Sequence, residues 1–179
     1  MNSRTVLSGS DIDRAVTRIA HEIVESNHGT ANLILLGIPT RGIWLAERIG
    51  KVLERSYPEF VAAEAIGRLD ITMYRDDLAI NPTRVVAETQ IPSGGIDDKV
   101  VVLVDDVLFS GRTIRAALDA LGDYGRPRAV RVAVLVDRGH RQLPIRADFV
   151  GKNLPTSVAE RIQVQLTETD SDNSVVIEG

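Results

Sequence analysis

The chain has 179 residues, of which 44% are hydrophobic and 26% are charged, and its formal net charge is −4. Because a length of about 100–200 residues is typical of one domain, we expect residues 1–179 to form a single domain, and the composition excludes a disordered chain. The acidic balance argues against a general nucleic-acid binder, and the absence of cysteine excludes disulfides, thiolate metal sites and a cysteine nucleophile.

A helical pattern occupies the N-terminal part of the chain. Apolar residues recur at i, i+3 and i+4 from Ile12 to Val24, which predicts an amphipathic helix. Ser10, with Asp13 three residues later, is the expected cap at its start.

A strand, a turn, a helix and a second strand are predicted next. Residues 33–37 are a short apolar run, as in a buried strand, and a turn at 39–42 leads into a helical pattern at 45–53. Residues 69–74 alternate between apolar and polar side chains, which predicts a strand with one solvated face.

A long polar stretch, residues 75–98, has little apolar periodicity and contains Asn81-Pro82 and Pro92-Ser-Gly-Gly95. Loops of this length in compact domains are usually functional lids or mobile segments. The alternative is a β-hairpin arm built partly from residues 85–87 and Ile91, and the two interpretations are compatible. We therefore expect a flexible loop or a hairpin arm here.

Strands and helices alternate in the second half of the chain. The run 100–104 has the composition of a strand buried on both faces of a parallel sheet, and a helix at 114–121 and a strand at 129–136 follow. This alternation predicts an α/β fold with a mainly parallel central sheet flanked by helices. Residues 168–179, whose charged residues are all acids, are expected to form an acidic C-terminal tail. Shorter strand patterns lie at 148–150, 162–166 and 175–177.

Two adjacent carboxylates, Asp105 and Asp106, follow the run 100–104. Adjacent acids repel each other and are poor core residues, so the pair is expected to face a pocket, a cation or hydroxyl donors. Ser110-Gly-Arg-Thr113 then supplies two hydroxyls, a glycine that allows close backbone approach and the free N–H groups of a helix start, which suit a phosphate monoester. Acids for sugar hydroxyls beside amides for a phosphate predict a ribose 5-phosphate site.

A nucleoside triphosphatase is the alternative for a strand that ends in acids. It requires a phosphate loop that ends in Gly-Lys-Ser/Thr, and the sequence contains none. Residues 37–42 have the glycine spacing but continue with Ile43 in place of lysine. The sequence therefore favours the ribose phosphate interpretation.

Residues 101–113 resemble the phosphoribosyl diphosphate (PRPP) motif of the type I phosphoribosyltransferases. The resemblance implies the type I phosphoribosyltransferase fold with a small hood, and displacement of diphosphate from PRPP by a nucleobase nitrogen. It assigns Asp105 and Asp106 to the ribose hydroxyls, directly or through water, and Thr40 and Arg41 to the diphosphate. Mg²⁺ would be held through PRPP, with water bridging to the two acids, and not by protein side chains alone.

This resemblance gives a role to residues in two groups. The implied catalytic residues are Asp105, Asp106 and Arg41. The implied PRPP- or nucleotide-binding residues are Thr40, Arg41, Val104, Asp105, Asp106, Val107, Leu108, Phe109, Ser110, Gly111, Arg112, Thr113 and Arg138.

Four further stretches resemble the family of bifunctional pyrimidine operon regulators and uracil phosphoribosyltransferases. One departure is Phe109-Ser110, where Tyr-Thr is common in that family. The resemblance implies conversion of uracil and PRPP into UMP and diphosphate, and binding of a leader mRNA hairpin when uridine nucleotides, UMP and UTP, are abundant. It also implies a homodimer or a higher homo-oligomer. The stretches that carry it are residues 15–22, 70–78, 134–141 and 143–157.

The same resemblance implies an RNA-binding surface in two basic parts of the chain. One is the polar stripe of the first predicted helix, for which an ordinary solvated face is the alternative. The other is the segment 138–152, with four basic residues and one acid, in which Arg138 lies nearer the active site. The uracil pocket is expected around 136–138 and near 152–153. The implied RNA-binding residues are Thr17, Arg18, His21, Arg141, Arg146 and Lys152.

Two other functions remain open at this point. One is a purely metabolic phosphoribosyltransferase for another base, guanine or hypoxanthine, without RNA binding. The other is a sensor that binds PRPP without catalysis. No apolar run is long enough to span a bilayer and residues 1–11 lack the pattern of a signal peptide, so we expect a soluble, cytoplasmic protein with no membrane partner.

Overall fold

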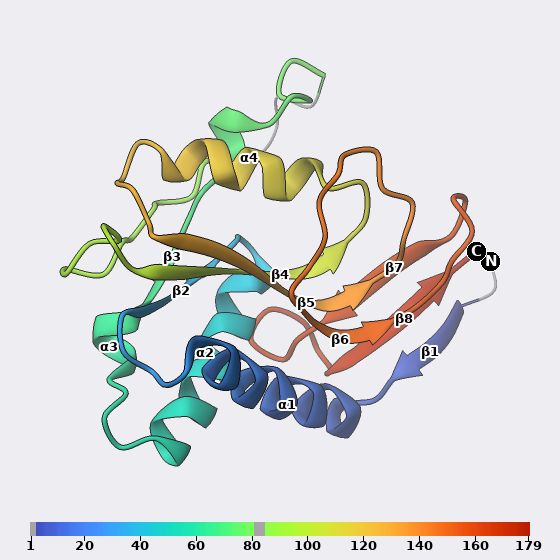
Figure 1. The fold of residues 1–179 in the computed structure, drawn as a ribbon. Coiled ribbons are helices and arrows are strands. Elements are labelled where there is room, and N and C mark those ends of the chain that lie inside the picture. The colour runs from blue at the N-terminus through green and yellow to red at the C-terminus, as the bar shows by residue number, and fades with distance from the viewer. Residues whose placement is uncertain (1–2, 81–84) are drawn as a thin grey trace.

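The computed structural model describes residues 3–80 and 85–179, and these form two sheets with helices around the larger one (Figure 1). The larger sheet has five strands in the order β3-β2-β4-β5-β6, and the smaller has three in the order β1-β8-β7. In chain order the elements are β1 (Ser3–Leu7), α1 (Gly9–Asn27), β2 (Leu33–Gly37), α2 (Arg41–Ser56), α3 (Ala62–Ala65), β3 (Ile66–Arg68), the 3-10 turn η1 (Thr72–Tyr74), β4 (Val100–Leu108), α4 (Arg112–Leu121), β5 (Ala129–Asp137), β6 (Phe149–Asn153), β7 (Arg161–Gln165) and β8 (Ser174–Glu178).

The five-stranded sheet is parallel throughout, as the alternation of strands and helices predicts. Successive residues of each strand point to opposite faces, so Val102 packs with α1 and α2 while Leu103 packs with α4. Figure 1 shows α1 and α2 on one face of the sheet and α4 on the other. The predicted α/β fold with a mainly parallel sheet flanked by helices is confirmed.

The N-cap of helix α1 lies two residues before the predicted one. Ser8, and not Ser10, is the N-cap, and it forms a capping box with Asp11 in place of Asp13. The Asp11 N–H donates to the Ser8 hydroxyl at 3.3 Å, and the Ser8 N–H donates to the Asp11 carboxylate at 2.8 Å. This reciprocal pair satisfies two backbone donors at the helix start, which explains the earlier beginning. The predicted apolar stripe of α1 is buried.

The prediction of a strand at 69–74 is wrong. Strand β3 ends at Arg68, and residues 72–74 form the turn η1. Strand β3 pairs with β2 only as far as Gly37, where β2 ends, so the chain beyond Arg68 has no strand to continue along. Leu69 is buried, but Met73 is 65% exposed.

The polar stretch 75–98 contains no strand element in its described parts, 75–80 and 85–98. Gln90 forms an isolated bridge with Arg68, and Val85 and Val86 are exposed. The hairpin arm predicted from 85–87 is therefore absent from the described residues. The Asn81-Pro82 dipeptide of this stretch lies outside them.

The small sheet joins the two ends of the chain. Strand β8 lies between β1 and β7 and pairs antiparallel with both. Strand β1 was not predicted, and the residues expected as an acidic tail, 168–179, include the central strand of this sheet. Glu168 forms an ion pair with Arg48 at 2.6 Å, which lowers the pKa of Glu168 and raises that of Arg48.

Strand β4 is longer than the predicted run 100–104. Its neighbour β5 pairs with it as far as Leu108, but its other neighbour, β2, ends opposite Val104. Beyond Val104 the β2 side of β4 is therefore free of a strand, and the acids that follow lie beside this free edge. No helix in the described part of the chain is long and apolar enough to cross a membrane.

Candidate functional site

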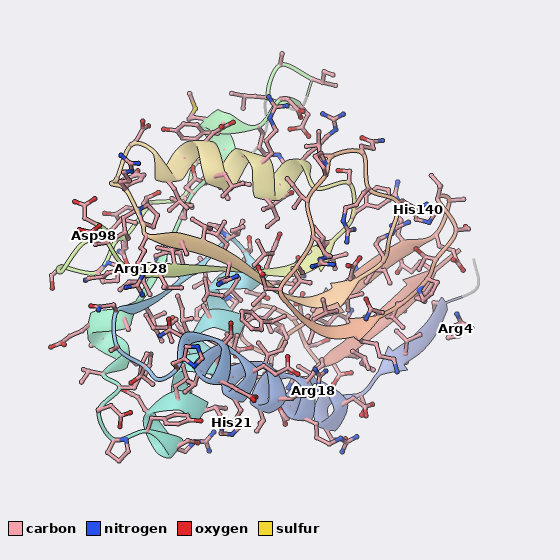
Figure 2. All side chains as sticks on the ribbon, in the orientation of Figure 1. Arg4, Arg18, His21, Asp98, Arg128 and His140 are labelled. Carbon is pink, nitrogen blue, oxygen red and sulfur yellow. The ribbon has the colours of Figure 1, made fainter. Side chains whose placement is uncertain are left out.

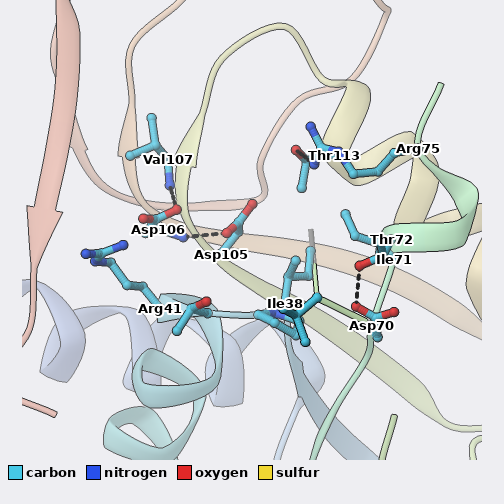
Figure 3. Close-up of a pocket in the computed structure, with 13 residues that line it drawn as sticks. Ile38, Arg41, Asp70, Ile71, Thr72, Arg75, Asp105, Asp106, Val107 and Thr113 are labelled. Atoms are coloured by element: carbon cyan, nitrogen blue, oxygen red, sulfur yellow. Dashed lines mark hydrogen bonds between the residues drawn. The ribbon is translucent and has the colours of Figure 1, made fainter. Parts of the chain in front are cut away.

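A cavity of about 530 Å³ opens at the carboxyl ends of β2, β3 and β4 (Figure 3). In parallel sheets, ligands bind at this edge because the strand ends and the loops that follow them leave a crevice there. Three segments wall the cavity: the turn after β2, the segment after β3 and the end of β4. Its lining residues are Ile38, Pro39, Thr40, Arg41, Asp70, Ile71, Thr72, Arg75, Val85, Asp105, Asp106, Val107 and Thr113.

The two adjacent carboxylates lie at the centre of this cavity. The Asp106 N–H donates to the Asp105 carboxylate at 2.9 Å, and the Val107 N–H donates to the Asp106 carboxylate at 2.8 Å. Asp105 is only 8% exposed, and burial, together with the charge of Asp106, raises its pKa well above the ordinary value, while the charge of Arg75 opposes this shift. This arrangement suits hydroxyl donors or a cation.

The turn after β2 brings Thr40 and Arg41 to the same cavity. Helix α2 starts at Arg41, and Gly42 lies so close to β4 that a Cβ there would be 2.3 Å from the Val104 carbonyl oxygen. The Arg41 guanidinium makes two hydrogen bonds to Asp170, at 2.8 and 3.2 Å. The loop between β7 and β8 of the small sheet therefore supplies a carboxylate that holds Arg41 at the cavity mouth.

The segment that follows β4, residues 109–113, is here called the phosphate loop. Gly111 has a φ of +94°, a backbone conformation that favours glycine, and α4 begins directly after it. The Ser110 carbonyl accepts hydrogen bonds from the N–H groups of Gln142 and Leu143, which fix the loop. A cavity of about 280 Å³ lies against this loop and reaches Asp105. The free N–H groups at the start of α4 suit a phosphate.

The structure adds a wall that sequence reasoning did not assign to the site: Asp70, Thr72 and Arg75. The Thr72 hydroxyl donates to Asp70 at 2.8 Å, and Arg75 donates to the Thr113 hydroxyl at 3.2 Å. Figure 3 shows these side chains across the cavity from Arg41. The sequence did carry a signal for this wall, because residues 70–78 are one of the stretches that resemble the family. The prediction of a strand at 69–74, however, placed the first part of that stretch in the sheet.

A second large cavity, of about 480 Å³, lies beyond β5 and β6, where the uracil pocket was expected. The Arg138 guanidinium stacks on the Phe109 ring at 4.1 Å and is 6% exposed, and burial lowers its pKa. Its Nη2 donates to the Ser157 carbonyl, but its Nε has no hydrogen-bond partner among the described residues. The cavity lining comprises Asp137, Arg138, Gly139, His140, Arg141, Asn153, Pro155 and Thr156.

The three candidate RNA-binding residues of α1 are exposed, and each makes a hydrogen bond within the chain. Figure 2 labels two of them, Arg18 and His21. The Thr17 hydroxyl donates to the Asp13 carbonyl at 2.9 Å. Arg18 donates to the backbone carbonyls of Val150 and Gly151 in β6, at 3.2 and 2.6 Å. The His21 ring is hydrogen-bonded to the Tyr57 hydroxyl at 3.1 Å.

The other three candidate RNA-binding residues lie in different surroundings. Lys152, in β6, and Arg146 are exposed. Arg141 instead supports the phosphate loop, because its guanidinium donates to the Phe109 carbonyl at 2.8 Å, to Ile145 at 2.8 Å and to Asp137 at 2.5 Å. Arg18 therefore ties the α1 stripe to β6, the strand that carries Lys152, and Arg141 lies with the cavities.

Comparisons with known proteins agree with this geometry. Residues 4–169 match the family model described as phosphoribosyl transferase domain. The bifunctional protein PyrR of Leifsonia xyli is 64% identical over 180 residues, which cover 99% of this chain and 98% of that protein. The PyrR proteins of Streptomyces coelicolor and Mycobacterium tuberculosis are 61% and 54% identical, over 98% of this chain and 89% and 93% of theirs.

Solved structures share the fold at low sequence identity. A hypoxanthine-guanine phosphoribosyltransferase from Bacillus anthracis has a TM-score of 0.71 at 18% identity, over 98% of each chain. A hypoxanthine phosphoribosyltransferase from Trypanosoma cruzi has a TM-score of 0.70 at 15% identity, over 97% of this chain and 95% of its own. These two show the type I phosphoribosyltransferase architecture alone. By its match to the family model and its full-length identity to the three bacterial relatives, the chain belongs to the phosphoribosyl transferase domain family and, within it, to the bifunctional PyrR proteins.

Proposed function

We propose that the protein transfers a phosphoribosyl group from PRPP to uracil, forming UMP and diphosphate, and that it regulates pyrimidine biosynthesis genes by binding leader mRNA. The observation that carries the enzymatic part is the adjacent pair of the buried Asp105 and the partly exposed Asp106. Both line the larger cavity, and Asp105 also lines the cavity against the phosphate loop. Relatives that are 54–64% identical over nearly the whole chain are named bifunctional protein PyrR. That name supports a pyrimidine as the base and the regulatory role.

The chemistry requires positioning and fixed charge more than a reactive side chain. The bond between the anomeric carbon and the diphosphate oxygen breaks, with its electron pair leaving on the diphosphate, while a uracil ring nitrogen bonds to that carbon and releases its proton to water. Positive charge develops on the sugar during this exchange. Asp105 and Asp106 would fix the ribose hydroxyls and favour that charge. Residues 110–113 would hold the 5-phosphate, and Thr40 and Arg41 the departing diphosphate.

We infer that Mg²⁺ enters with PRPP. Asp105 and Asp106 offer the oxygen donors that Mg²⁺ prefers. Across residues 3–80 and 85–179, however, no group of three or more His, Cys, Asp or Glu side chains could enclose an ion, so most ligands would be PRPP oxygens and water. When bound, the ion would neutralise charge on the diphosphate.

The RNA-binding role would use an exposed basic surface apart from the PRPP cavities. Arg18, tied to β6, lies next to the strand that carries Lys152, and Arg146 precedes that strand. Basic residues gathered on one surface of a chain with net charge −4 would favour a specific contact with RNA phosphates over nonspecific binding. Arg141, held at the phosphate loop, is better suited to a supporting role.

The proposal also covers the location, oligomeric state, domain organisation and ligands of the protein. We infer that it works in the cytoplasm as a homodimer or higher homo-oligomer, and that residues 1–179 act as one phosphoribosyltransferase domain. The described parts of the polar stretch, residues 75–80 and 85–98, would form a flexible loop beside the site. Its ligands would be PRPP, uracil, UMP and UTP. The family membership supports each of these inferences.

Turnover with different bases tests the enzymatic proposal. We expect diphosphate release from PRPP with uracil at a kcat/KM at least about a hundredfold above that with hypoxanthine or guanine, because a pocket built to pair with one base leaves polar groups unpaired with another. Steady-state diphosphate release measures it. Preferential release with a purine would favour the purely metabolic alternative, and binding of PRPP without release with any base would favour the sensor.

Separation of RNA binding from catalysis tests the regulatory proposal. We expect Arg146→Gln and Lys152→Gln each to reduce the slope of log Kd against log salt by about 1 for the cognate pyrimidine leader RNA, because each removes a phosphate contact. The uracil turnover of Arg146→Gln should stay within about twofold of that of the original protein.

Two further variants control this experiment. Arg128→Gln, at the opposite end of the sheet (Figure 2), should change neither readout. Arg141→Gln, by contrast, should reduce uracil turnover, because it removes the hydrogen bond from the guanidinium to the Phe109 carbonyl of the phosphate loop. Unchanged RNA binding in both the Arg146 and Lys152 variants would refute this surface.

A further inference from the structure

Arg75 lies where the two PRPP cavities meet. It lines both the cavity that contains the paired acids and the cavity against the phosphate loop. Its side chain is 18% exposed, and its guanidinium donates to the Thr113 hydroxyl at 3.2 Å and to Asp77 at 3.0 Å. Figure 3 shows it extending from the segment after η1 toward Thr113. A positive charge is therefore already in contact with a hydroxyl of the phosphate loop.

The next residue, Asp76, contacts the phosphate loop from the same segment. Its carboxylate forms an ion pair with the Arg112 guanidinium, whose Nε donates to Gln142 at 3.0 Å. Both partners of the ion pair are about half exposed, with side-chain exposures of 44% and 45%. The loop's own arginine is thus neutralised by a carboxylate of the neighbouring segment.

A phosphate dianion in the loop would change the balance of these contacts. Charge-assisted hydrogen bonds to phosphate are shorter and stronger than those to a neutral hydroxyl, so Arg75 would gain by moving from the Thr113 hydroxyl to phosphate oxygens. The same dianion would compete with Asp76 for Arg112, since an exposed ion pair contributes little to stability. The two neighbouring residues therefore respond to one ligand in opposite ways.

We propose that Arg75 is a further phosphate-binding residue, and that Asp76 is the counter-ion that the 5-phosphate of the ligand displaces from Arg112. The inference rests on the proposed function, which supplies PRPP as substrate and UMP as product. Both carry a ribose 5-phosphate group. The segment that begins at Arg75 thereby becomes part of the phosphate site, and Asp76 lowers the affinity of the free protein for phosphate.

The first experiment removes the charge of Arg75. We expect Arg75→Gln to weaken binding of ribose 5-phosphate, measured by calorimetry, by about tenfold to a hundredfold, the loss expected for a hydrogen bond to a charged group. Arg75→Lys, which keeps the charge, should retain part of the affinity and guards against a folding defect in the glutamine variant. In turnover assays the KM for PRPP should rise by the same factor with little change in kcat.

Arg128→Gln is the matched control, since Arg128 is exposed and precedes β5 at the opposite end of the sheet (Figure 2). Affinity within about twofold of the original protein for folded Arg75→Gln would overturn the proposal, because a lost charged hydrogen bond costs more than that. Titration with UMP alongside ribose 5-phosphate and PRPP shows whether product and substrate share the contact. Because binding of ribose 5-phosphate needs no turnover, its result stands even if uracil proves to be the wrong base.

The second experiment releases Arg112. We expect Asp76→Asn to tighten ribose 5-phosphate binding by about twofold to fivefold, the range of an exposed ion pair, with the gain fading at high salt. Asp98→Asn, an exposed acid at the far end of the sheet, should have no effect. In an Arg112→Gln background, Asp76→Asn should also have no effect. An equal gain in that background would show that Asp76 acts through general charge, and would overturn its assignment as the counter-ion of Arg112.

Discussion

Asp105→Asn is expected to reduce turnover by about a hundredfold to a thousandfold, the cost of removing one preorganised charged group from an active site. The side-chain carbonyl of the introduced asparagine could still accept the Asp106 N–H that Asp105 accepts at 2.9 Å, so the local backbone should persist. Lost activity would then report the missing charge opposite the ribose. Steady-state kinetics with PRPP and uracil measure this effect.

The same substitution is expected to raise thermal stability at neutral pH. Burial and the charge of Asp106 raise the pKa of Asp105 in the folded protein above its unfolded value. A raised pKa means that the stability contributed by this group is fully present below the unfolded pKa of about 4 and is lost as pH rises through the folded pKa. The gain from the substitution should therefore be small near pH 4 and grow toward pH 8.

Thermal unfolding of both proteins between pH 4 and pH 8 provides the test. Asp119→Asn, which removes an exposed carboxylate of α4, is the control and should leave the unfolding temperature nearly unchanged. An Asp105 variant that is less stable than the original protein at pH 8 would contradict the assignment of Asp105 as a carboxylate that costs stability in the folded protein.

Gly42→Ala is expected to damage both stability and PRPP use. A Cβ at this position would lie 2.3 Å from the Val104 carbonyl oxygen and 3.3 Å from the Asp105 Cα, so α2 and β4 would have to separate. Overpacking of this kind costs about 1–3 kcal/mol of stability. A shift of about 1 Å in the turn that carries Thr40 and Arg41 can cost about a hundredfold in rate.

Thermal unfolding and the kcat/KM for PRPP together measure the Gly42→Ala effect. Gly122→Ala is the matched control, because Gly122 has an ordinary φ of −58° and is exposed at the end of α4. It should leave both quantities nearly unchanged. If Gly42→Ala behaved like Gly122→Ala, the close approach of α2 to β4 would not position the site.

Some parts of the fold were predictable because their patterns are local. The apolar strand 100–104, the acids after it and the glycine-containing loop lie within a single short run of consecutive residues, 100–113. The apolar stripe of α1 was equally clear, but its cap was placed at Ser10 in place of Ser8, because two serines two residues apart satisfy the same pattern. For these elements, local rules thus predicted the type of structure but misplaced the cap of α1 and the end of β4.

The strand predicted at 69–74 failed for a different reason. Alternation of apolar and polar residues there was real, since Leu69 and Ile71 are buried. A strand also needs a partner, however, and β2 ends at Gly37. The error hid Asp70, Thr72 and Arg75, which turn into the cavity once the strand has ended.

The amino-acid sequence by itself determined the α/β class, the ribose phosphate motif and, through resemblance, the family, because each depends on neighbouring residues or on motif identity. Only the tertiary structure decided that Asp170 holds Arg41 across 129 positions of the chain, that Arg141 supports the phosphate loop, and that Arg75 reaches Thr113. The physical reason is that such contacts depend on the order of strands and on where each one ends. The periodicity of apolar residues along the chain determines neither the order of the strands nor their ends.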